Sequence, residues 1–281
     1  MKVAIFCNDD LTSNIVFSEV FNLEEIKVAG IYVMKTPKHH KKSILFAALG
    51  LLKKMSFRYW IFLVIVSTLF KVFEFVTAAF QLPPKSGYLV SLRRYAELNG
   101  IQYKKIHDFS DPDFIRSIQK EELDLLLIRV GAILSGDLIS SPKFGTWCLH
   151  SSILPSGRGI AGEFHALRHD DLPVGSSLFK VIEKLDEGPV IDRVTINRER
   201  SASVYHHIIL NNRSAAKLIA KKCEWLHSEK LISHIPPNKD VQSSYFSWPV
   251  GSQVRDLRKK GTYLMTLTEF CQLFLLAIRA R

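Results

Sequence analysis

Short apolar runs alternate along the chain with segments of helical periodicity. The runs expected to form strands are Lys2–Cys7, Val28–Val33, Gln102–Ile106, Leu123–Arg129, Thr146–His150, Gly175–Ile182 and Val190–Ile196. Helices are expected between them at Ser86–Leu98 and Phe114–Glu122, and after the last strand at Ser203–Glu229. Alternating strands and helices are typical of βαβ units. The sequence therefore predicts an α/β fold of Rossmann-like type, with a mostly parallel sheet flanked by helices.

The predicted elements divide the chain into one large domain and a short extension. We expect an α/β domain over residues 1–235, with a basic, apolar helical insertion at 36–85, and a C-terminal extension over 236–281. The extension ends in Thr262–Arg281, an apolar stretch that predicts a short helix. A helix docked on the domain is the simplest interpretation of this tail.

The segment from Ser43 to Phe80 interrupts the alternation with two apolar stretches that predict helices. Phe57–Phe80 as one helix would be about 36 Å long, enough to cross a bilayer. However, both ends of the insertion must return to the same sheet, and Ser43–Leu52 would reach only about 15 Å as a helix. Three interpretations stay open: two helices lying on a membrane surface through 43–80, a helical pair packed against protein, and a spanning or re-entrant element.

Charge is concentrated in the same part of the chain. The net charge is +11, and Ile26–Phe73 holds nine Lys/Arg and no Asp or Glu. The rest is close to neutral, so nucleic-acid binding by the whole protein is not expected. On a membrane surface, five of these cations would face anionic headgroups: Lys41, Lys42, Lys53, Lys54 and Arg58.

The cysteines and the N-terminus bear on compartment and metal binding. Cys7, Cys148, Cys223 and Cys271 lie far apart, which argues against a zinc site or a disulfide framework and fits a reducing compartment. The apolar run after Met1 is too short for a signal peptide. We therefore expect a cytoplasmic protein, peripheral at the inner face of a membrane if the insertion binds lipid, and no metal.

The polar residues best placed for chemistry are His150 and Asp186. Thr146, Cys148 and His150 share one face of a predicted strand, and His150 ends it where a Ser/Pro/Gly-rich loop begins. Ligands of open α/β sheets bind at such strand ends. Asp186 lies in a turn before an apolar strand, where an acid commonly accepts backbone N–H groups. A carboxylate that reached the imidazole would instead hold its tautomer and charge.

The segments around these two residues resemble the signature of the formyltransferases that depend on 10-formyltetrahydrofolate. The family pattern is roughly G-x-x-N-x-H-P-S-L-L-P-x-x-R-G, followed by G-x-T-x-H and D-x-G-P-I. The positions that align with it are Gly145, Cys148, His150, Ser152, Ile153-Leu154-Pro155, Arg158-Gly159, Gly175, Phe179 and Asp186-Glu187-Gly188-Pro189. The resemblance extends over about 1–35 and 86–261 and is specific over 131–191.

This resemblance implies direct transfer of a formyl group to a small-molecule amine. His150 would stabilise the oxyanion or relay a proton, and Asp186 would orient His150. The implied folate site consists of Ala132, Ile133, Leu134, Ile182, Leu185 and Asp186. The implied acceptor site consists of Ser152, Arg158 and Gly159, and His165 in the following helix is a further candidate for it.

Two positions depart from the family pattern and leave alternatives open. Cys148 stands where the family has asparagine, and a thiol is a weaker donor to an oxyanion than an amide. Phe179 stands where the family has a second histidine, and Ser151, a possible substitute donor, replaces a proline. A nucleophilic Cys148 is disfavoured because its same-face neighbour His150 is about 7 Å away. The chain is either an active formyltransferase with an altered triad, or a catalytically impaired binding or membrane-associated protein.

The acceptor expected from the sequence is an amino sugar on a nucleotide or lipid carrier. The insertion lies where methionyl-tRNA formyltransferases, by resemblance, carry a basic tRNA-contacting loop. Here it is strongly apolar as well as basic, which suits a lipid surface better than a phosphate backbone. A methionyl-tRNA formyltransferase-like enzyme is the alternative, and a homo-oligomer is also considered.

Overall fold

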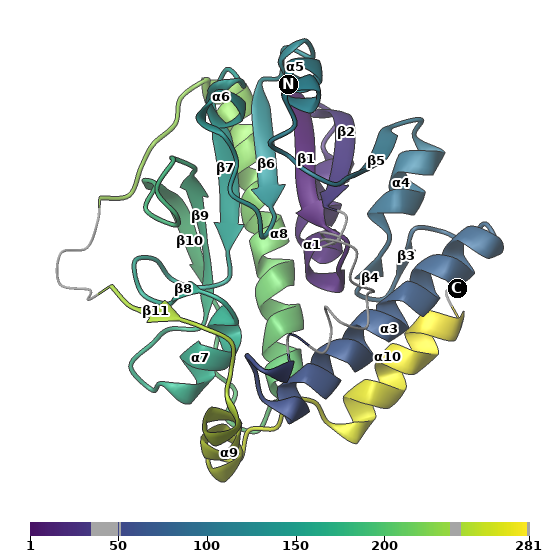
Figure 1. The fold of residues 1–281 in the computed structure, drawn as a ribbon. Helices are drawn as coiled ribbons and strands as arrows, with labels where there is room; N and C mark the ends of the chain where they lie inside the picture. Colours follow the sequence, from purple (N-terminus) through teal and green to yellow (C-terminus); the bar gives the residue numbers. More distant parts are fainter. Residues whose placement is uncertain (35–49, 51, 237–242, 280–281) are drawn as a thin grey trace.

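The computed structural model describes residues 1–34, 50, 52–236 and 243–279, and its centre is one seven-stranded sheet (Figure 1). The strand order is β10-β9-β7-β6-β1-β2-β5. The strands are β1 (Lys2–Asn8), β2 (Lys27–Met34), β5 (Gln102–Ile106), β6 (Leu125–Arg129), β7 (Thr146–His150), β9 (Gly175–Lys180) and β10 (Val190–Thr195). All neighbours pair in parallel except β7–β9 and β9–β10. The predicted α/β class with a mostly parallel sheet is confirmed.

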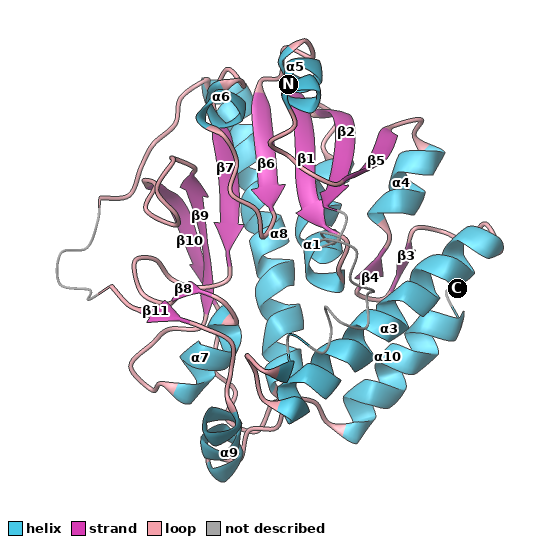
Figure 2. Ribbon diagram, viewed as in Figure 1, coloured by secondary structure: helices cyan, strands magenta, loops and turns pink. Residues whose placement is uncertain are grey.

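Helices cover both sides of this sheet and its lower edge (Figure 2). They are α1 (Leu11–Phe17), η1 (Ser18–Asn22, a 3-10 helix), α3 (Phe57–Ala79), α4 (Leu92–Leu98), α5 (Pro112–Gln119), α6 (Gly136–Ser140), α7 (Gly162–Arg168), α8 (Val204–Glu229), α9 (Gly251–Lys259) and α10 (Leu267–Arg279). Two strand pairs lie outside the main sheet: β3 (Lys85–Ser86) with β4 (Leu89–Val90), and β8 (Arg158–Gly159) with β11 (Tyr245–Phe246).

The helix expected over Ser86–Leu98 is shorter than predicted. Its first part is the β3–β4 hairpin, whose turn contains Gly87 at φ +59°, a left-handed conformation that glycine adopts without strain. The helix begins after Ser91, whose hydroxyl accepts a hydrogen bond from the Arg94 N–H at 3.2 Å. The local turn and cap therefore override the apolar periodicity.

The second predicted helix and the strand after it have different boundaries from those expected. Helix α5 begins at Pro112, where the Asp111 carboxylate caps it, and ends at Gln119. Glu122 has φ +48°, which is not helical, and β6 then begins at Leu125. The short helices α1, α6 and α9 were not predicted, because so few turns carry little periodic signal.

Two buried clusters cover the two faces of the sheet. Alternate strand residues point to opposite sides, so Leu125 and Leu127 pack with α8, whereas Leu126 and Ile128 pack with α5 and α6. On β7, Trp147 and Leu149 belong to the α8 side. Cys148 packs on the other side, as the alternation predicted. This register decides which β7 side chains are available to a ligand.

A third cluster joins α3 and the C-terminal extension to the domain. Tyr59, Phe70 and Phe73 of α3 are buried with Leu273 and Ala277 of α10. The C-terminal helix therefore packs on the domain, as expected for the tail. The first helix predicted for the insertion, over Ser43–Leu52, falls mainly on residues 43–49 and 51, outside the described residues.

Helix α3 is long and apolar enough to cross a membrane by length and composition. Its inner side is nevertheless fixed to the domain. The Lys71 ammonium lies 2.6 Å from Asp9, just after β1, and 2.7 Å from Glu74. These contacts place α3 beside the carboxyl ends of the parallel strands.

Candidate active site

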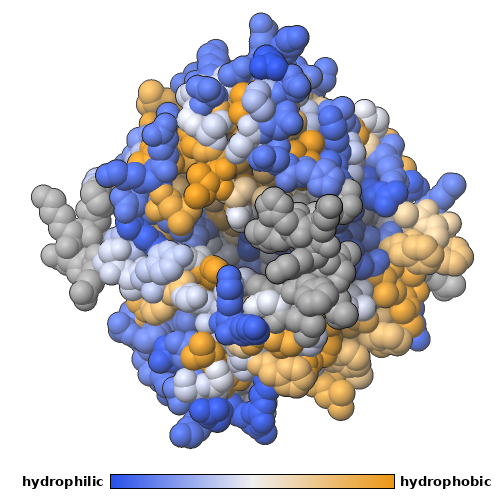
Figure 3. Space-filling view, viewed as in Figure 1, coloured by the Kyte–Doolittle hydropathy of each residue, from blue (hydrophilic) through white to orange (hydrophobic). Residues whose placement is uncertain are grey.

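An apolar pocket lies over β6, β7 and β9, with a cavity of about 90 Å³. Its walls are the segment after β6 and the loop after β9, and Cys148 and Phe179 contribute from the strands. All six residues predicted to hold a folate line it: Ala132, Ile133, Leu134, Ile182, Leu185 and Asp186. Figure 3 shows apolar side chains gathered in front of these strands. Such a pocket suits a flat, largely apolar ring.

Few of the side chains predicted to hold the folate can form hydrogen bonds. Ile133 is 77% exposed and Leu185 is 62% exposed. Asp186 has φ +51°, an unusual conformation for a residue with a side chain. The Asp186 carboxylate accepts no hydrogen bond from the described residues, so the N–H-accepting turn considered for it is not formed.

His150 lies at the carboxyl end of β7, and its ring Nε2 is 3.0 Å from the Gly157 carbonyl oxygen. A carbonyl oxygen only accepts, so Nε2 must carry the proton in this bond. In the neutral ring, Nδ1 is then left as an acceptor. Within the described residues no hydrogen bond joins Asp186 to this ring, and the orienting role of Asp186 stays a prediction. The observed contact of the ring is with Gly157, because the loop after β7 turns back over the strand end.

Cys148 lines the pocket two residues before His150 on the same strand. Burial, and then the negative charge of Asp186, raise the pKa of its thiol to about 12, while Arg129 acts in the opposite direction. The thiol is therefore protonated at neutral pH. A thiolate nucleophile at this position is disfavoured, in agreement with the argument from strand spacing.

Ser151, considered above as a substitute donor, meets polar residues beside His150 that the sequence did not single out. The Arg129 guanidinium, at the end of β6, donates to the Ser151 hydroxyl at 3.0 Å and to the Asn212 side-chain oxygen. The Glu163 carboxylate of α7 accepts from Asn211 at 2.9 Å. We call this group the strand-end cluster; its members are Arg129, Ser151, Glu163, Asn211 and Asn212.

Glu163 is the least exposed charged group of the strand-end cluster, at 6% exposure. Burial raises its pKa, while Arg129, its hydrogen bonds and His150 lower it. His150 is therefore within electrostatic reach of a buried carboxyl. Glu163 and the adjacent pair Asn211-Asn212 are present in the sequence, but only the fold buries them and brings them to one strand end.

The three residues predicted for the acceptor site have different environments. Ser152 is buried, and its hydroxyl donates to the Ser156 carbonyl at 3.1 Å. Arg158 forms an ion pair of 3.0 Å with Glu187. Gly159 has φ +99°, and a Cβ there would lie 2.1 Å from the Phe246 carbonyl oxygen. Arg158 thus offers a cation near the turn that contains Asp186, whereas Ser152 and Gly159 shape the backbone.

His165, the further acceptor-site candidate, is a packed core residue. Its ring is 1% exposed, lies 2.9 Å from the Ser247 carbonyl and stacks on Phe246 at a centroid distance of 4.4 Å. No grouping of His, Cys, Asp or Glu that could hold a metal ion occurs in the described ranges.

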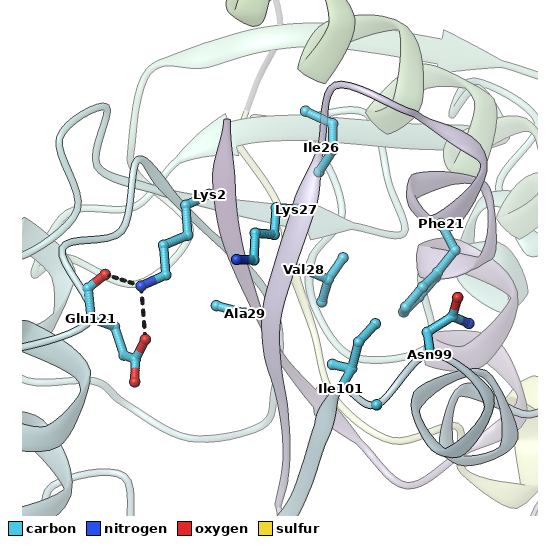
Figure 4. Close-up of a pocket in the computed structure, with 10 residues that line it drawn as sticks. Lys2, Phe21, Ile26, Lys27, Val28, Ala29, Asn99, Ile101 and Glu121 are labelled. Carbon is cyan, nitrogen blue, oxygen red and sulfur yellow. Dashed lines mark hydrogen bonds and ion pairs between the residues drawn. The ribbon is translucent and has the colours of Figure 1, made fainter.

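A larger hollow of about 490 Å³ lies at the amino ends of strands β1, β2 and β5. It contains Lys27 and Val28 at the start of β2, Ile101 just before β5, and the Lys2–Glu121 ion pair of 2.8 Å (Figure 4). Ligands of open α/β sheets bind at the carboxyl ends of the strands, and this hollow is at their amino ends. The smaller pocket beside His150 is therefore the candidate active site.

The fold and this site define an α/β protein with a ligand pocket beside the end of a parallel strand. Residues 93–215 match the family model described as formyl transferase. The methionyl-tRNA formyltransferase of Thermobifida fusca (strain YX) is 30% identical over 144 residues, which cover 50% of this chain and 45% of the relative. The chain thus spans less than half the length of this curated relative.

Solved structures show the same fold at low sequence identity. A phosphoribosylglycinamide formyltransferase from Anaplasma phagocytophilum aligns with a TM-score of 0.54 and 14% identity, over 87% of this chain and 97% of that one. A sugar N-formyltransferase from Shewanella sp. aligns with a TM-score of 0.51 and 12% identity, over 99% and 88%. The match over residues 93–215 shows a similarity in sequence to the formyl transferases, and these solved structures show that the chain shares their fold.

Proposed function

We propose that this protein transfers a formyl group from 10-formyltetrahydrofolate to the amine of an amino sugar carried on a nucleotide or a lipid. The observation that carries the proposal is the apolar pocket beside His150, built from the segment that matches the formyl transferase family. The pocket would hold the folate ring through its apolar walls. The carbonyl and amide groups of the 130–134 and 181–186 backbone would supply polar contacts to its edge.

In the proposed reaction, the acceptor nitrogen attacks the formyl carbon and a tetrahedral oxyanion forms. The new C–N bond remains, and the bond between the formyl carbon and N10 of the folate breaks. One proton must leave the acceptor amine and one must reach N10. His150 is the side chain positioned for this transfer, since its Nδ1 is a free acceptor when Nε2 donates to Gly157.

Arg129 supports the proposal because it brings a permanent positive charge to the end of β6. It is close enough to influence the pKa of both Cys148 and Glu163. Cys148 is a weak donor, so a nearby cation could compensate electrostatically for the amide that the family has there. Asp186 lines the same pocket and is close enough to Cys148 to raise the pKa of its thiol.

An amino sugar, rather than a tRNA, is the acceptor that we propose. The sugar N-formyltransferase of known structure shares the fold over 99% of this chain and 88% of its own. The apolar character of α3 also suits a lipid carrier better than an RNA backbone. The cytoplasmic location expected from the sequence stays a prediction.

A catalytically impaired binding protein is the second candidate, and a specific observation favours it. Cys148 and Phe179 both line the pocket, so the two departures from the family pattern lie at the centre of the site. A pocket of this kind could bind a folate without transferring its formyl group.

The test is formyl transfer from 10-formyltetrahydrofolate to a panel of amino-sugar nucleotides, with initiator methionyl-tRNA as a further acceptor and folate binding measured in parallel. For the active enzyme, Cys148→Asn should raise turnover by up to roughly 10²-fold, because it restores an oxyanion donor. Cys148→Ala, the matched control, should change turnover little.

Folate binding without transfer by wild type or Cys148→Asn would establish the impaired protein. Absence of folate binding would contradict both candidates. Transfer to the tRNA alone would support the formyltransferase and exclude the amino-sugar acceptor.

A further inference from the structure

The outer sides of α3 and α10 carry several exposed apolar residues, with exposed Thr68 between Val64 and Phe75 on α3. On α3 the exposed apolar residues are spaced four, three and eleven positions apart. Each spacing is close to a whole number of helical turns, so these residues lie on one stripe. Exposed apolar residues of α10 likewise recur one or two turns apart. We call this surface the α3–α10 face; it consists of Phe57, Ile61, Val64, Phe75, Leu267, Phe274, Leu275 and Ile278.

The two stripes are neighbours on the molecular surface, because the helices lie side by side in contact with each other. Figure 3 shows apolar side chains gathered at the lower right, over α3 and α10. Phe75 is 70% exposed and Leu267 is 78% exposed. Because the inner sides of both helices already fill the domain core, the outer stripes are not needed to hold the helices in place. Exposed apolar surface of this extent indicates an interaction.

Basic residues lie at both ends of the α3–α10 face. Lys53, Lys54 and Arg58 are exposed around the start of α3, and Arg279 is exposed at the end of α10. Arg58 also lines a cavity of about 140 Å³ together with Arg258. This cavity would admit part of an anionic group next to the apolar stripe.

The acidic residues of the two helices are already engaged. Glu74 is paired with Lys71, and Glu269 accepts from the Ser203 hydroxyl at 2.7 Å and from the backbone N–H of Thr266 at 2.7 Å. Within the described parts of α3 and α10, the charges left for a partner are therefore cationic. The aromatic residues Trp60 and Tyr263 flank the start of the face, and such rings favour the boundary between lipid and water.

We propose that the α3–α10 face docks on an anionic lipid membrane, with both helices parallel to its surface. Apolar side chains would enter the acyl boundary, while Arg58, Arg258 and Arg279 would meet headgroup phosphates. A second copy of the chain is a poorer occupant, since a symmetric dimer would bring the same cationic ends to a shared interface. The attachment is peripheral because the inner side of α3 is buried in the domain.

This inference goes beyond formyl transfer and does not depend on it. It adds that the enzyme works at a membrane surface, where an acceptor with a lipid carrier would be concentrated. Membrane binding is measured without any folate or acceptor. A failed transfer assay and a failed binding assay are therefore separate results.

The test is co-sedimentation of the full chain with phosphatidylcholine vesicles and with vesicles that also contain phosphatidylglycerol. Binding to the anionic vesicles should weaken as salt increases. Phe75→Glu or Phe274→Glu should each weaken it by about tenfold or more. Arg58→Gln or Arg279→Gln should each weaken it by about fivefold.

The matched control is Leu231→Glu, which changes a residue that is 64% exposed but lies outside the α3–α10 face. It should bind like the wild type. Circular dichroism and thermal unfolding verify that each variant is folded. Equal binding to neutral and anionic vesicles, or none to either, overturns the proposal. So does a concentration-dependent dimer that Phe75→Glu dissociates, if the vesicles bind no protein.

Discussion

The apolar pocket and the strand-end cluster are adjacent, but they are built from opposite kinds of residue. The pocket contains exposed aliphatic side chains such as Ile133 and Leu185. The strand-end cluster contains hydrogen-bonded polar groups such as Glu163 and Asn211, which are 6% and 0% exposed. The two regions meet on β7, where Cys148 lines the pocket and His150 is two residues further along.

This difference indicates that the pocket binds the ligand and that the groups at the strand end take part in proton transfer. Aliphatic walls bind a ring through contacts that do not depend on protonation. Buried ionisable groups can gain or lose a proton, and burial shifts their pKa because it disfavours the charged form. We therefore expect ligand binding and turnover to respond to different substitutions. Variants of each region can break or sharpen that comparison.

The largest effect is expected for His150→Ala. Loss of a positioned acid–base group should lower the rate of formyl transfer by roughly 10²–10⁴-fold. Folate affinity should stay close to that of the wild type, because His150 does not line the pocket. Steady-state kinetics and calorimetric titration with a folate analogue measure the two quantities. A fall in affinity as large as the fall in rate would show that the two regions act as one.

Leu185→Asp should have a smaller effect than His150→Ala, and it should act on folate binding. A charge in the pocket wall should weaken folate binding by about tenfold, since the apolar contact is lost. The free energy of unfolding should change by less than about 0.5 kcal/mol, because Leu185 is an exposed residue. Binding titration and urea unfolding check both statements. Leu231→Asp, at a similarly exposed site, is the control and should leave folate binding unchanged.

Glu163→Gln should have the smallest effect, and one that depends on pH. Burial raises the pKa of Glu163, so the folded protein binds this proton more tightly than the unfolded chain. The resulting stability is fully present below the unfolded glutamate pKa of about 4.3 and is lost as the pH rises through the folded pKa. Glutamine imitates the protonated form. The variant should therefore become more stable than the wild type as the pH rises through this window.

Urea unfolding of both proteins between pH 4 and pH 8 measures this difference. Glu224→Gln removes an exposed carboxylate from α8 and serves as the control for the change in net charge. A stability difference that is constant with pH would contradict the assigned pKa direction for Glu163.

The sheet was predictable because strand periodicity is a local property. Buried parallel strands such as Leu125–Arg129 are continuous apolar runs, and the alternation on Thr146–His150 defines the faces of that strand. The hairpin at Lys85–Val90 was not predictable from periodicity, because one glycine turn and the Ser91 cap decide it. The segments that line the pocket were also recoverable, since 131–191 resembles a family signature.

What the sequence by itself determined is the fold class, the strand that carries Cys148 and His150, and the two segments that form the pocket. Only the tertiary structure decided that Gly157 holds the His150 ring, and that Arg129 and Glu163 join it from β6 and α7. It also decided that the apolar stripes of α3 and α10 are neighbours on the surface. The physical reason is that periodicity and motifs report contacts between neighbours in the chain. Long-range electrostatics and helix pairing depend on segments that only folding brings together.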